Sequence, residues 1–150
     1  MKKITVFLFA VGLCFCLLTG AARMASAYEV PVNHPIDVEL AKRIAESSSA
    51  AAGAVEAYEY AAEEWNKLLN KNYNALMQRL NKEEQETLRA SQREWIKYRD
   101  LEFAFNKKYW SKFSGAMYVP SPYAFKCNFV RDRALRLGYY LEDLAASQKN

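Results

Sequence analysis

Side chains of the types that catalyse reactions are few in this sequence. His34 is its single histidine and has no second metal ligand nearby, so a zinc site and a serine–histidine pair both lack a component. Glu83, Glu84 and Glu86 carry carboxylates, but the helix dipole alone favours acidic residues at a helix start. The sequence has no glycine-rich phosphate-binding loop. We therefore predict a protein that is not an enzyme, with no catalytic residue, metal site or cofactor.

Another set of polar residues lies in the segment 91–100, SQREWIKYRD. Gln92, Trp95 and Arg99 are spaced three and four residues apart, which places them on one helix face where a simple bundle has leucines. Arg99 can form a cation–π contact of about 0.5–2 kcal/mol with the Trp95 ring. These residues either fix the register of packed helices or line a ligand groove, and the interior position favours the structural interpretation. Asp100 is expected to pair with a cation of another helix. The candidates are Arg131 and Arg133.

The loop from Lys112 to Ser121 combines hydrogen-bond donors with apolar anchors of the kinds enriched in interfaces. The donors are Lys112, Ser114, Tyr118 and Ser121, and the anchors are Phe113, Met117, Tyr118 and Tyr123. We predict that this loop binds a protein partner. The alternative, which base rates for loops of this size favour, is a plain connector whose aromatic side chains are tucked against the end of the bundle.

The first 27 residues have the three parts of a secretory signal. Lys2 and Lys3 precede an apolar run, residues 4–18, and small residues, Ala25-Ser26-Ala27, stand before the expected cleavage site. A membrane anchor would need about 20 apolar residues, and this run is shorter. We therefore expect cleavage after Ala27, no membrane span in the mature chain, and a periplasmic or secreted protein.

Removal of the signal changes both the charge and the cysteine content. The mature chain keeps eighteen basic and seventeen acidic residues, so its near-neutral charge does not favour a nucleic acid partner. Cys127 becomes the single cysteine in an oxidising compartment, and no intrachain disulfide can form. It is expected to be a buried thiol, with a covalent dimer or mixed disulfide as the alternative.

Hydrophobic periodicity predicts helices throughout the mature chain. Residues 28–54 are expected to form an extended lead, a short helix over 36–46, and a weak break at Ser47–Ser49 and Gly53. From Val55 a single apolar stripe follows a helical period to residue 80. Its members are Val55, Tyr58, Ala62, Trp65, Leu69, Tyr73, Leu76 and Leu80. Asn81 with Glu84 three places on is a capping box, so the next helix is expected to start there.

That next helix is expected to run to about Phe113, followed by a loop to Pro120. Ser121 and Pro122 then offer an N-cap and a first helical residue for a final helix. Its inward stripe is Tyr123, Val130, Ala134, Leu137, Leu141 and Leu144. The predicted fold is therefore all-α, an antiparallel bundle of three main helices with a short N-terminal helix alongside. We expect the Trp65 face and the Trp95 face of the first two long helices to pack together as its interior.

Two motifs in this order resemble the LprI-like lysozyme-inhibitor domain family of small exported bacterial domains. They are Leu69, Asn70 and Tyr73 in the first long helix, and Gln92, Trp95, Tyr98, Arg99 and Asp100 in the second. The segment around Cys127 is similar to the family's C-terminal cysteine segment, and we assign residues 55–146 to the domain. The family commonly has a cysteine where this chain has Phe103, so the resemblance implies the loss of the usual cross-link to position 127.

The resemblance implies an envelope protein that binds and inhibits lysozyme and has no catalytic residues of its own. A muramidase cleft contains a pair of carboxyl groups, which donors of the loop 112–121 could bind. A cationic lysozyme favours an acidic partner surface, so the near-neutral charge of the mature chain argues against inhibition unless charge is concentrated locally. An acidic patch on the first long helix could provide this, although such a run is more often a solvated helix face. The patch consists of Glu56, Glu59, Glu63 and Glu64. The alternative function is a helical structural or adaptor module of the envelope that inhibits no enzyme.

Overall fold

The computed structural model describes residues 34–148, which lie in one compact unit of the chain, Pro31–Asn150. The predicted signal peptide, residues 1–27, and most of the extended lead lie outside the described residues. Within residues 34–148 every regular element is a helix. These elements are α1 (Pro35–Glu46), α2 (Ala50–Arg79), α3 (Lys82–Trp110), a short 3-10 helix (Ala116–Tyr118) and α4 (Ser121–Ser147). The predicted all-α fold is confirmed.

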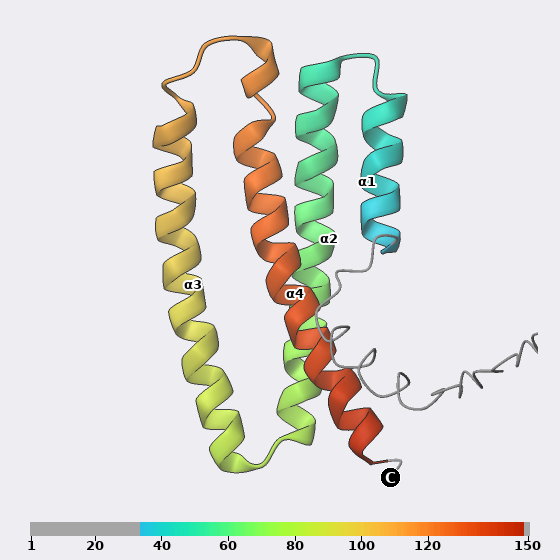
Figure 1. The fold of residues 1–150 in the computed structure, drawn as a ribbon, viewed down its shortest axis with the longest axis vertical. Coiled ribbons are helices and arrows are strands. Elements are labelled where there is room, and N and C mark those ends of the chain that lie inside the picture. Colours follow the sequence, from blue (N-terminus) through green and yellow to red (C-terminus); the bar gives the residue numbers. More distant parts are fainter. Residues whose placement is uncertain (1–33, 149–150) are drawn as a thin grey trace, which may run out of the picture. The chain divides into compact units, whose positions relative to one another are not determined.

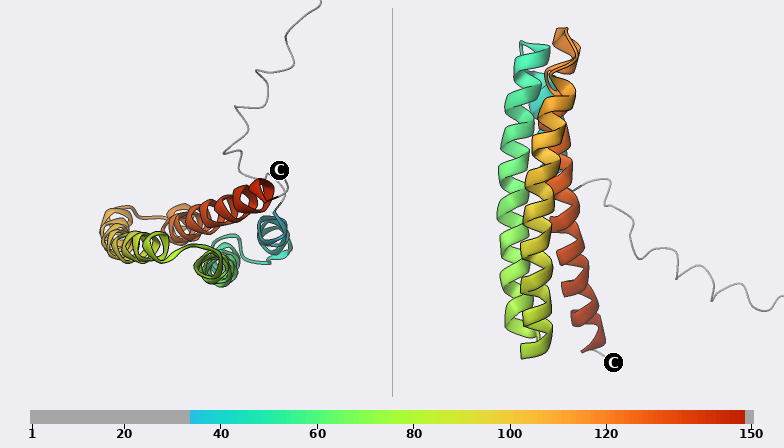
Figure 2. Two further views of the ribbon diagram at one scale, coloured as in Figure 1. Left: turned by 90° about the horizontal axis from the view of Figure 1, so that it is seen from below. Right: turned by 90° about the vertical axis from the view of Figure 1, so that its left-hand side faces the viewer.

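The helices alternate in direction along the chain, so that α1 and α3 run opposite to α2 and α4 (Figure 1). The most extensive packing joins α2 to α4, while α1 packs on α2 and α3 packs on α4. Viewed along the helices, α3 lies at one edge of the bundle and α1 at the other (Figure 2). This is the expected antiparallel bundle of three main helices with a short N-terminal helix alongside.

The expected packing of the Trp65 face on the Trp95 face is wrong. Trp65 is fully buried, and its ring lies against His34 at 4.3 Å between centroids. Trp95 is half-buried, and its ring lies 5.9 Å from that of Phe129 on α4. The reason is that α4 has two apolar faces, one toward α2 and one toward α3, and it receives the stripes of both helices.

The buried core belongs to α2 and α4. Small side chains on both helices, among them Ala57, Ala61 and Ala134, let the backbones approach closely. The large members are Trp65, Leu69, Leu76 and Leu137. The alanines rather than Val55 and Tyr58 define the core face of the first half of α2. By contrast, Asn106 is the one buried residue that α3 contributes within the described part of the chain.

The start of α2 differs from its prediction. The helix begins at Ala50 instead of Val55, because alanines have the highest helix propensity and carry the helix through Gly53. A Cβ atom on Gly53 would lie 1.5 Å from the Oγ of Ser47, so glycine is required where the α1–α2 turn folds back. The turn itself lies at Ser47–Ser49, as predicted.

The ends of α3 and the start of α4 were predicted with unequal success. The capping box at the start of α3 is confirmed, with the Asn81 side chain accepting from the Glu84 N–H and the Glu84 carboxylate accepting from the Asn81 N–H. The helix ends at Trp110, earlier than Phe113, because the chain turns at Ser111. Ser121 is the first residue of α4 and not its N-cap, since Pro120 already occupies the cap position.

Candidate functional site

The loop between α3 and α4 is folded on an aromatic cluster that we call the tip. It contains Tyr109 and Trp110 at the end of α3 and Phe113 and Tyr118 in the loop. The Phe113 ring lies 5.5 Å from that of Trp110 and 5.3 Å from that of Tyr118. Aromatic pairs at these distances contribute packing energy beyond their buried area. The loop is therefore held in one shape and can present other side chains outward.

The backbone of the loop reverses at Gly115. Its φ of 119° lies in the region that favours glycine, and it precedes the short 3-10 helix, in which the Tyr118 N–H donates to the Gly115 carbonyl at 3.1 Å. Met117, in the middle of this helix, is 78% exposed. Phe113 is also exposed, and Tyr118 is half-buried. The connector interpretation thus holds for Tyr118, whereas Met117 projects into solvent.

The remaining predicted loop residues fall into two groups. Lys112 and Ser114 are exposed beside the aromatic cluster. Ser121 and Tyr123 are half-buried in the first turn of α4, where the Lys126 ammonium lies 5.9 Å from the Tyr123 ring centroid. Lys112, Phe113, Ser114 and Met117 therefore form the outer part of the tip, and Ser121 and Tyr123 form its base.

The tip end of the bundle is electrostatically asymmetric. From residue 103 to residue 131 the chain contains no Asp or Glu, while Lys107, Lys108, Lys112 and Lys126 fall in this range. The N-terminal half of α2 lies at the same end of the bundle (Figure 1) and carries the predicted acidic patch. Three of its members are exposed, namely Glu56, Glu59 and Glu63, and Glu64 pairs with Lys67. A cationic tip thus adjoins an acidic flank.

The motif residues of α2 and the start of the α3 motif lie near one another. Leu69 is buried in the core. Asn70, Tyr73 and Gln92 line a hollow of about 420 Å³ between α2 and α3. The Gln92 side chain, however, accepts a 3.0 Å hydrogen bond from Arg133 of α4, which is a contact between helices and supports the structural interpretation.

The rest of the α3 motif packs on α4. Arg99 lies over the Trp95 ring, with its guanidinium carbon 5.4 Å from the centroid, so the predicted cation–π contact is present. Tyr98 is 54% exposed, with its ring 5.6 Å from that of Phe129. Phe103, at the position of the family's cysteine, packs edge-on against Phe125 and Phe129. Aromatic contacts therefore join α3 to α4 at this position.

The expected cross-helix partner of Asp100 is wrong. Its carboxylate accepts hydrogen bonds from its neighbour Arg99, at 2.7 and 2.9 Å, because it points about 100° away from Arg99 around the helix and does not face α4. Arg133 binds Gln92, as described above. Arg131 forms a two-pronged ion pair with Asp37 of α1, with contacts of 2.6 to 3.0 Å. The hydrogen bonds that Arg131 donates to the Asp37 carboxylate raise the pKa of the Arg131 guanidinium.

Two titratable groups lie beside this ion pair. Burial lowers the pKa of His34, and the positive charge of Arg131 acts in the same direction against the opposing effect of Asp37. Cys127 is 1% exposed, and burial raises the pKa of its thiol to about 11. The buried-thiol interpretation is confirmed. A covalent dimer through Cys127 is not supported, because a partner could reach the sulfur only if α4 left the core.

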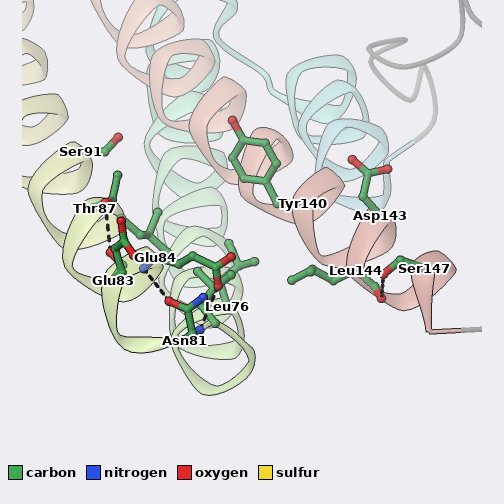
Figure 3. A pocket seen from close by; sticks show the side chains of 12 residues that line it. Leu76, Asn81, Glu83, Glu84, Thr87, Ser91, Tyr140, Asp143, Leu144 and Ser147 are labelled. Atoms are coloured by element: carbon green, nitrogen blue, oxygen red, sulfur yellow. Dashed lines mark hydrogen bonds between the residues drawn. The ribbon is translucent and has the colours of Figure 1, made fainter.

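A groove lies at the opposite end of the bundle from the tip, where α4 diverges from α2 and α3 (Figure 3). Its volume is about 850 Å³. Its apolar lining consists of Leu76, Leu80, Leu88, Tyr140 and Leu144, and its acidic residues are Glu83, Glu84 and Asp143. The lining contains no Lys or Arg. Leu76 is buried, and Leu80 and Leu144 are half-buried against the core, so their assignment to inward stripes holds. Periodicity could not show that the helices separate beside them.

A row of exposed apolar side chains on α3 was also missed. We call Tyr98, Leu101, Phe105 and Tyr109 the α3 stripe. Leu101 is 70% exposed and Phe105 is 64% exposed. Spacings of three and four residues were the available signal, but the same helix carries a second such pattern, Trp95, Arg99 and Phe103, which faces α4. The α3 stripe lies about a third of a turn away from that face.

Within residues 34–148 no group of three or more His, Cys, Asp or Glu side chains is arranged to hold a metal ion. None of the helices in the same range has the length and apolar character that a membrane span requires.

The model of a protein family described as lysozyme inhibitor LprI matches residues 43–137, from the last turn of α1 into α4. No curated protein and no solved structure matches the chain.

Proposed function

This chain belongs to the LprI family of lysozyme inhibitors, and from that premise we propose that it binds a lysozyme-type muramidase and blocks its catalytic cleft. The observation that carries the proposal is the tip. An ordered loop presents Met117, 78% exposed, beside the donors Lys112 and Ser114, and the segment 103–131 that contains this loop has no Asp or Glu. This combination suits a cleft that contains carboxyl groups.

The proposed contact divides into two parts. The Lys112 ammonium and the Ser114 hydroxyl would donate hydrogen bonds to the catalytic carboxyl groups, which are desolvated once the loop has entered the cleft. Met117 and Phe113 would fill apolar parts of the cleft and exclude water from those bonds. Because the aromatic cluster already fixes the loop, little conformational entropy is lost on binding.

The acidic flank of α2 complements this contact. Lysozyme is cationic outside its cleft, so Glu56, Glu59 and Glu63 at the tip end would attract its body while the tip enters the acidic cleft. This arrangement allows a mature chain of near-neutral total charge to bind a strongly basic enzyme.

A turbidity assay tests the proposal. Residues 28–150 are titrated against several animal-type lysozymes during lysis of a wall suspension, and micromolar protein is expected to slow lysis by at least one of them. Met117→Asp and Lys112→Glu are expected to raise the concentration needed by about tenfold or more, equivalent to about 1.4 kcal/mol each.

The matched control is Val38→Asp, because Val38 is a similarly exposed apolar residue (55%) on α1. This variant is expected to inhibit like the unmodified protein. If the unmodified protein slows none of the enzymes, inhibition is refuted. If Val38→Asp weakens inhibition as much as Met117→Asp, the tip is not the contact surface.

We also propose a periplasmic or secreted location, since a target that attacks the wall is met outside the cytoplasm. Support comes from the secretory pattern of residues 1–27. N-terminal sequencing of the protein recovered from the producing cells is expected to begin at Tyr28, and recovery with Met1 intact would contradict cleavage.

A second candidate function, an envelope adaptor that inhibits no enzyme, rests on the groove of about 850 Å³ with its five apolar residues. A groove of this kind can accept an apolar segment of another protein. Leu88→Asp and Leu144→Asp would disrupt an adaptor contact there, and they are expected to leave lysozyme inhibition by the tip unchanged.

A further inference from the structure

Helix α3 has an incomplete set of partners within its own chain. It packs on α4 through Trp95, Phe103 and Arg99, and it buries a single residue, Asn106, within the part of the chain described. The α3 stripe lies on another side of the helix. Leu101 and Phe105 are its most exposed members, while Tyr98 also contacts Phe129 and Tyr109 also contacts Phe113 of the tip. A contiguous apolar row of this kind on a helix at the edge of a bundle is typical of an interaction surface.

We propose that the α3 stripe is a dimer interface, through which two copies of this chain associate by antiparallel packing of α3 on α3. In this arrangement Leu101 lies on the two-fold axis. A residue that follows Leu101 by a given number of positions in one copy therefore faces the residue that precedes Leu101 by about the same number in the other copy. Leu101 then faces Leu101 of the second copy. Phe105 faces the region of Tyr98 and Lys97.

The charges that border the stripe determine this orientation. Glu94 and Lys108 lie seven residues to either side of Leu101, and both are exposed. Glu94 also pairs with Lys97 of its own helix at 2.8 Å, so Lys108 of the second copy would be a further cation beside this carboxylate. The antiparallel arrangement places Glu94 opposite Lys108 of the second copy, and the symmetry repeats this pair. A parallel two-fold arrangement would instead place Lys108 opposite Lys108 and Glu94 opposite Glu94, which is repulsive. The positions of these two residues therefore favour the antiparallel dimer and oppose the parallel one.

The exposed area is that of a reversible dimer. Large apolar side chains expose about 150–250 Å² when free, so stripe residues that are 41–70% exposed together offer roughly 450 Å². This is little more than half of the roughly 800 Å² per partner of a standard interface, so the charged border has to supply the rest. We expect dissociation in roughly the micromolar range.

Sedimentation equilibrium of residues 28–150 without lysozyme tests the dimer. The weight-average mass is expected to rise from monomer to dimer across micromolar concentrations. Leu101→Glu is expected to remain monomeric throughout, and the matched control Val38→Glu, on exposed α1 surface, is expected to dimerise normally. A monomer at all concentrations, or equal loss in the two variants, would overturn the proposal.

Charge reversal tests the orientation. Glu94→Lys and Lys108→Glu are each expected to weaken dimerisation about three- to tenfold, and the double variant is expected to restore it. If the double variant is weaker than either single variant, the antiparallel register is wrong. Both sites are exposed, and circular dichroism verifies that each variant is folded.

Disulfide trapping provides an independent test of the axis. Leu101→Cys is expected to form a covalent dimer rapidly under mild oxidation, because the two thiols meet at the two-fold axis, while Val38→Cys is expected to remain largely monomeric. Equal cross-linking would overturn the assignment. The tip variant Met117→Asp is expected to dimerise normally, so failure of the inhibitor proposal and failure of the dimer proposal are distinguishable.

Discussion

The ion pair between Asp37 and Arg131 ties α1 to α4. Its side chains are 22% and 15% exposed, and Arg131 also lies 5.4 Å from the Trp65 ring centroid. A charged pair shielded from water is worth little in net terms, yet removal of one partner leaves the other charge poorly solvated. Arg131 therefore holds α1 in place, whereas the sequence suggested Arg131 as a partner of Asp100.

Asp37→Asn is expected to lower the free energy of unfolding by about 1–3 kcal/mol, because the Arg131 guanidinium loses its carboxylate while it stays largely covered. Urea denaturation followed by circular dichroism measures the change. The control is Glu39→Gln on the same helix, which breaks the exposed pair with Arg43 and is expected to cost about 0.5 kcal/mol or less. Equal losses would show that Asp37 is no more important than a surface charge.

His34 is expected to make stability dependent on pH. Its Nδ1 accepts a hydrogen bond from the Ile36 N–H at 3.2 Å, and its pKa in the folded state lies below the ordinary value. The unfolded chain therefore binds a proton more readily. The contribution of neutral His34 to the free energy of unfolding is complete above about pH 6.5. It is lost as the pH falls through the lower pKa that His34 has in the folded state.

The test compares the protein with His34→Asn, in which asparagine can still cap α1 but does not titrate near neutrality. Urea midpoints of the two proteins are expected to be similar at about pH 7.5. At about pH 5.5 the midpoint of the unmodified protein is expected to fall further than that of the variant. Parallel behaviour of the two proteins would show that another group controls the pH response.

At the scale of elements, the four helices differ in how far they depend on the core. The central pair α2 and α4 supplies nearly all the buried side chains, whereas α3 is held by one aromatic seam. Local stability follows buried apolar contact. Helix α3, which carries the second of the two family motifs, is therefore the least embedded of the three long helices.

This difference predicts unequal effects of the two tryptophans. Trp65→Ala is expected to cost about 3–5 kcal/mol, because a fully buried indole leaves a large cavity. Trp95→Ala, from a half-buried position, is expected to cost about 1–3 kcal/mol. Urea denaturation measures both. A larger loss for Trp95 would place α3 in the core and contradict the packing described above.

At the scale of the whole molecule, the fold is maintained without a covalent cross-link between α3 and α4. Aromatic rings around Phe103 join these helices, and the Cys127 side chain of α4 is buried in the core. Any oligomer therefore has to form through surface side chains and not through this thiol.

We expect the Cys127 thiol of residues 28–150 to react with a thiol reagent such as DTNB only when the protein unfolds. Burial limits access, and a pKa of about 11 keeps the thiolate fraction small. Reaction in native buffer is expected to be far slower than in urea, and a non-reducing gel is expected to show only the monomer band. Fast native labelling would show that α4 opens readily.

The sequence by itself determined the local features of this protein. The number and order of the helices, the Asn81–Glu84 capping box, the Ser47–Ser49 turn and the Trp95–Arg99 contact all depend on residues a few positions apart, so periodicity and spacing suffice to predict them. The motif that spans α2 and α3 was likewise sufficient for the family, because a family match depends on the order and spacing of residues along the chain.

Only the tertiary structure decided which faces meet. An apolar stripe indicates that one face of a helix is covered, but it does not identify the neighbouring helix that covers it. The sequence therefore could not predict that α2 and α3 both pack on α4, which residues Arg131 and Asp100 bind, or that the α3 stripe is exposed. The same holds for the ordered tip and for the groove where α4 diverges. Each depends on distances between residues far apart in the chain, which are set by the simultaneous packing of all four helices.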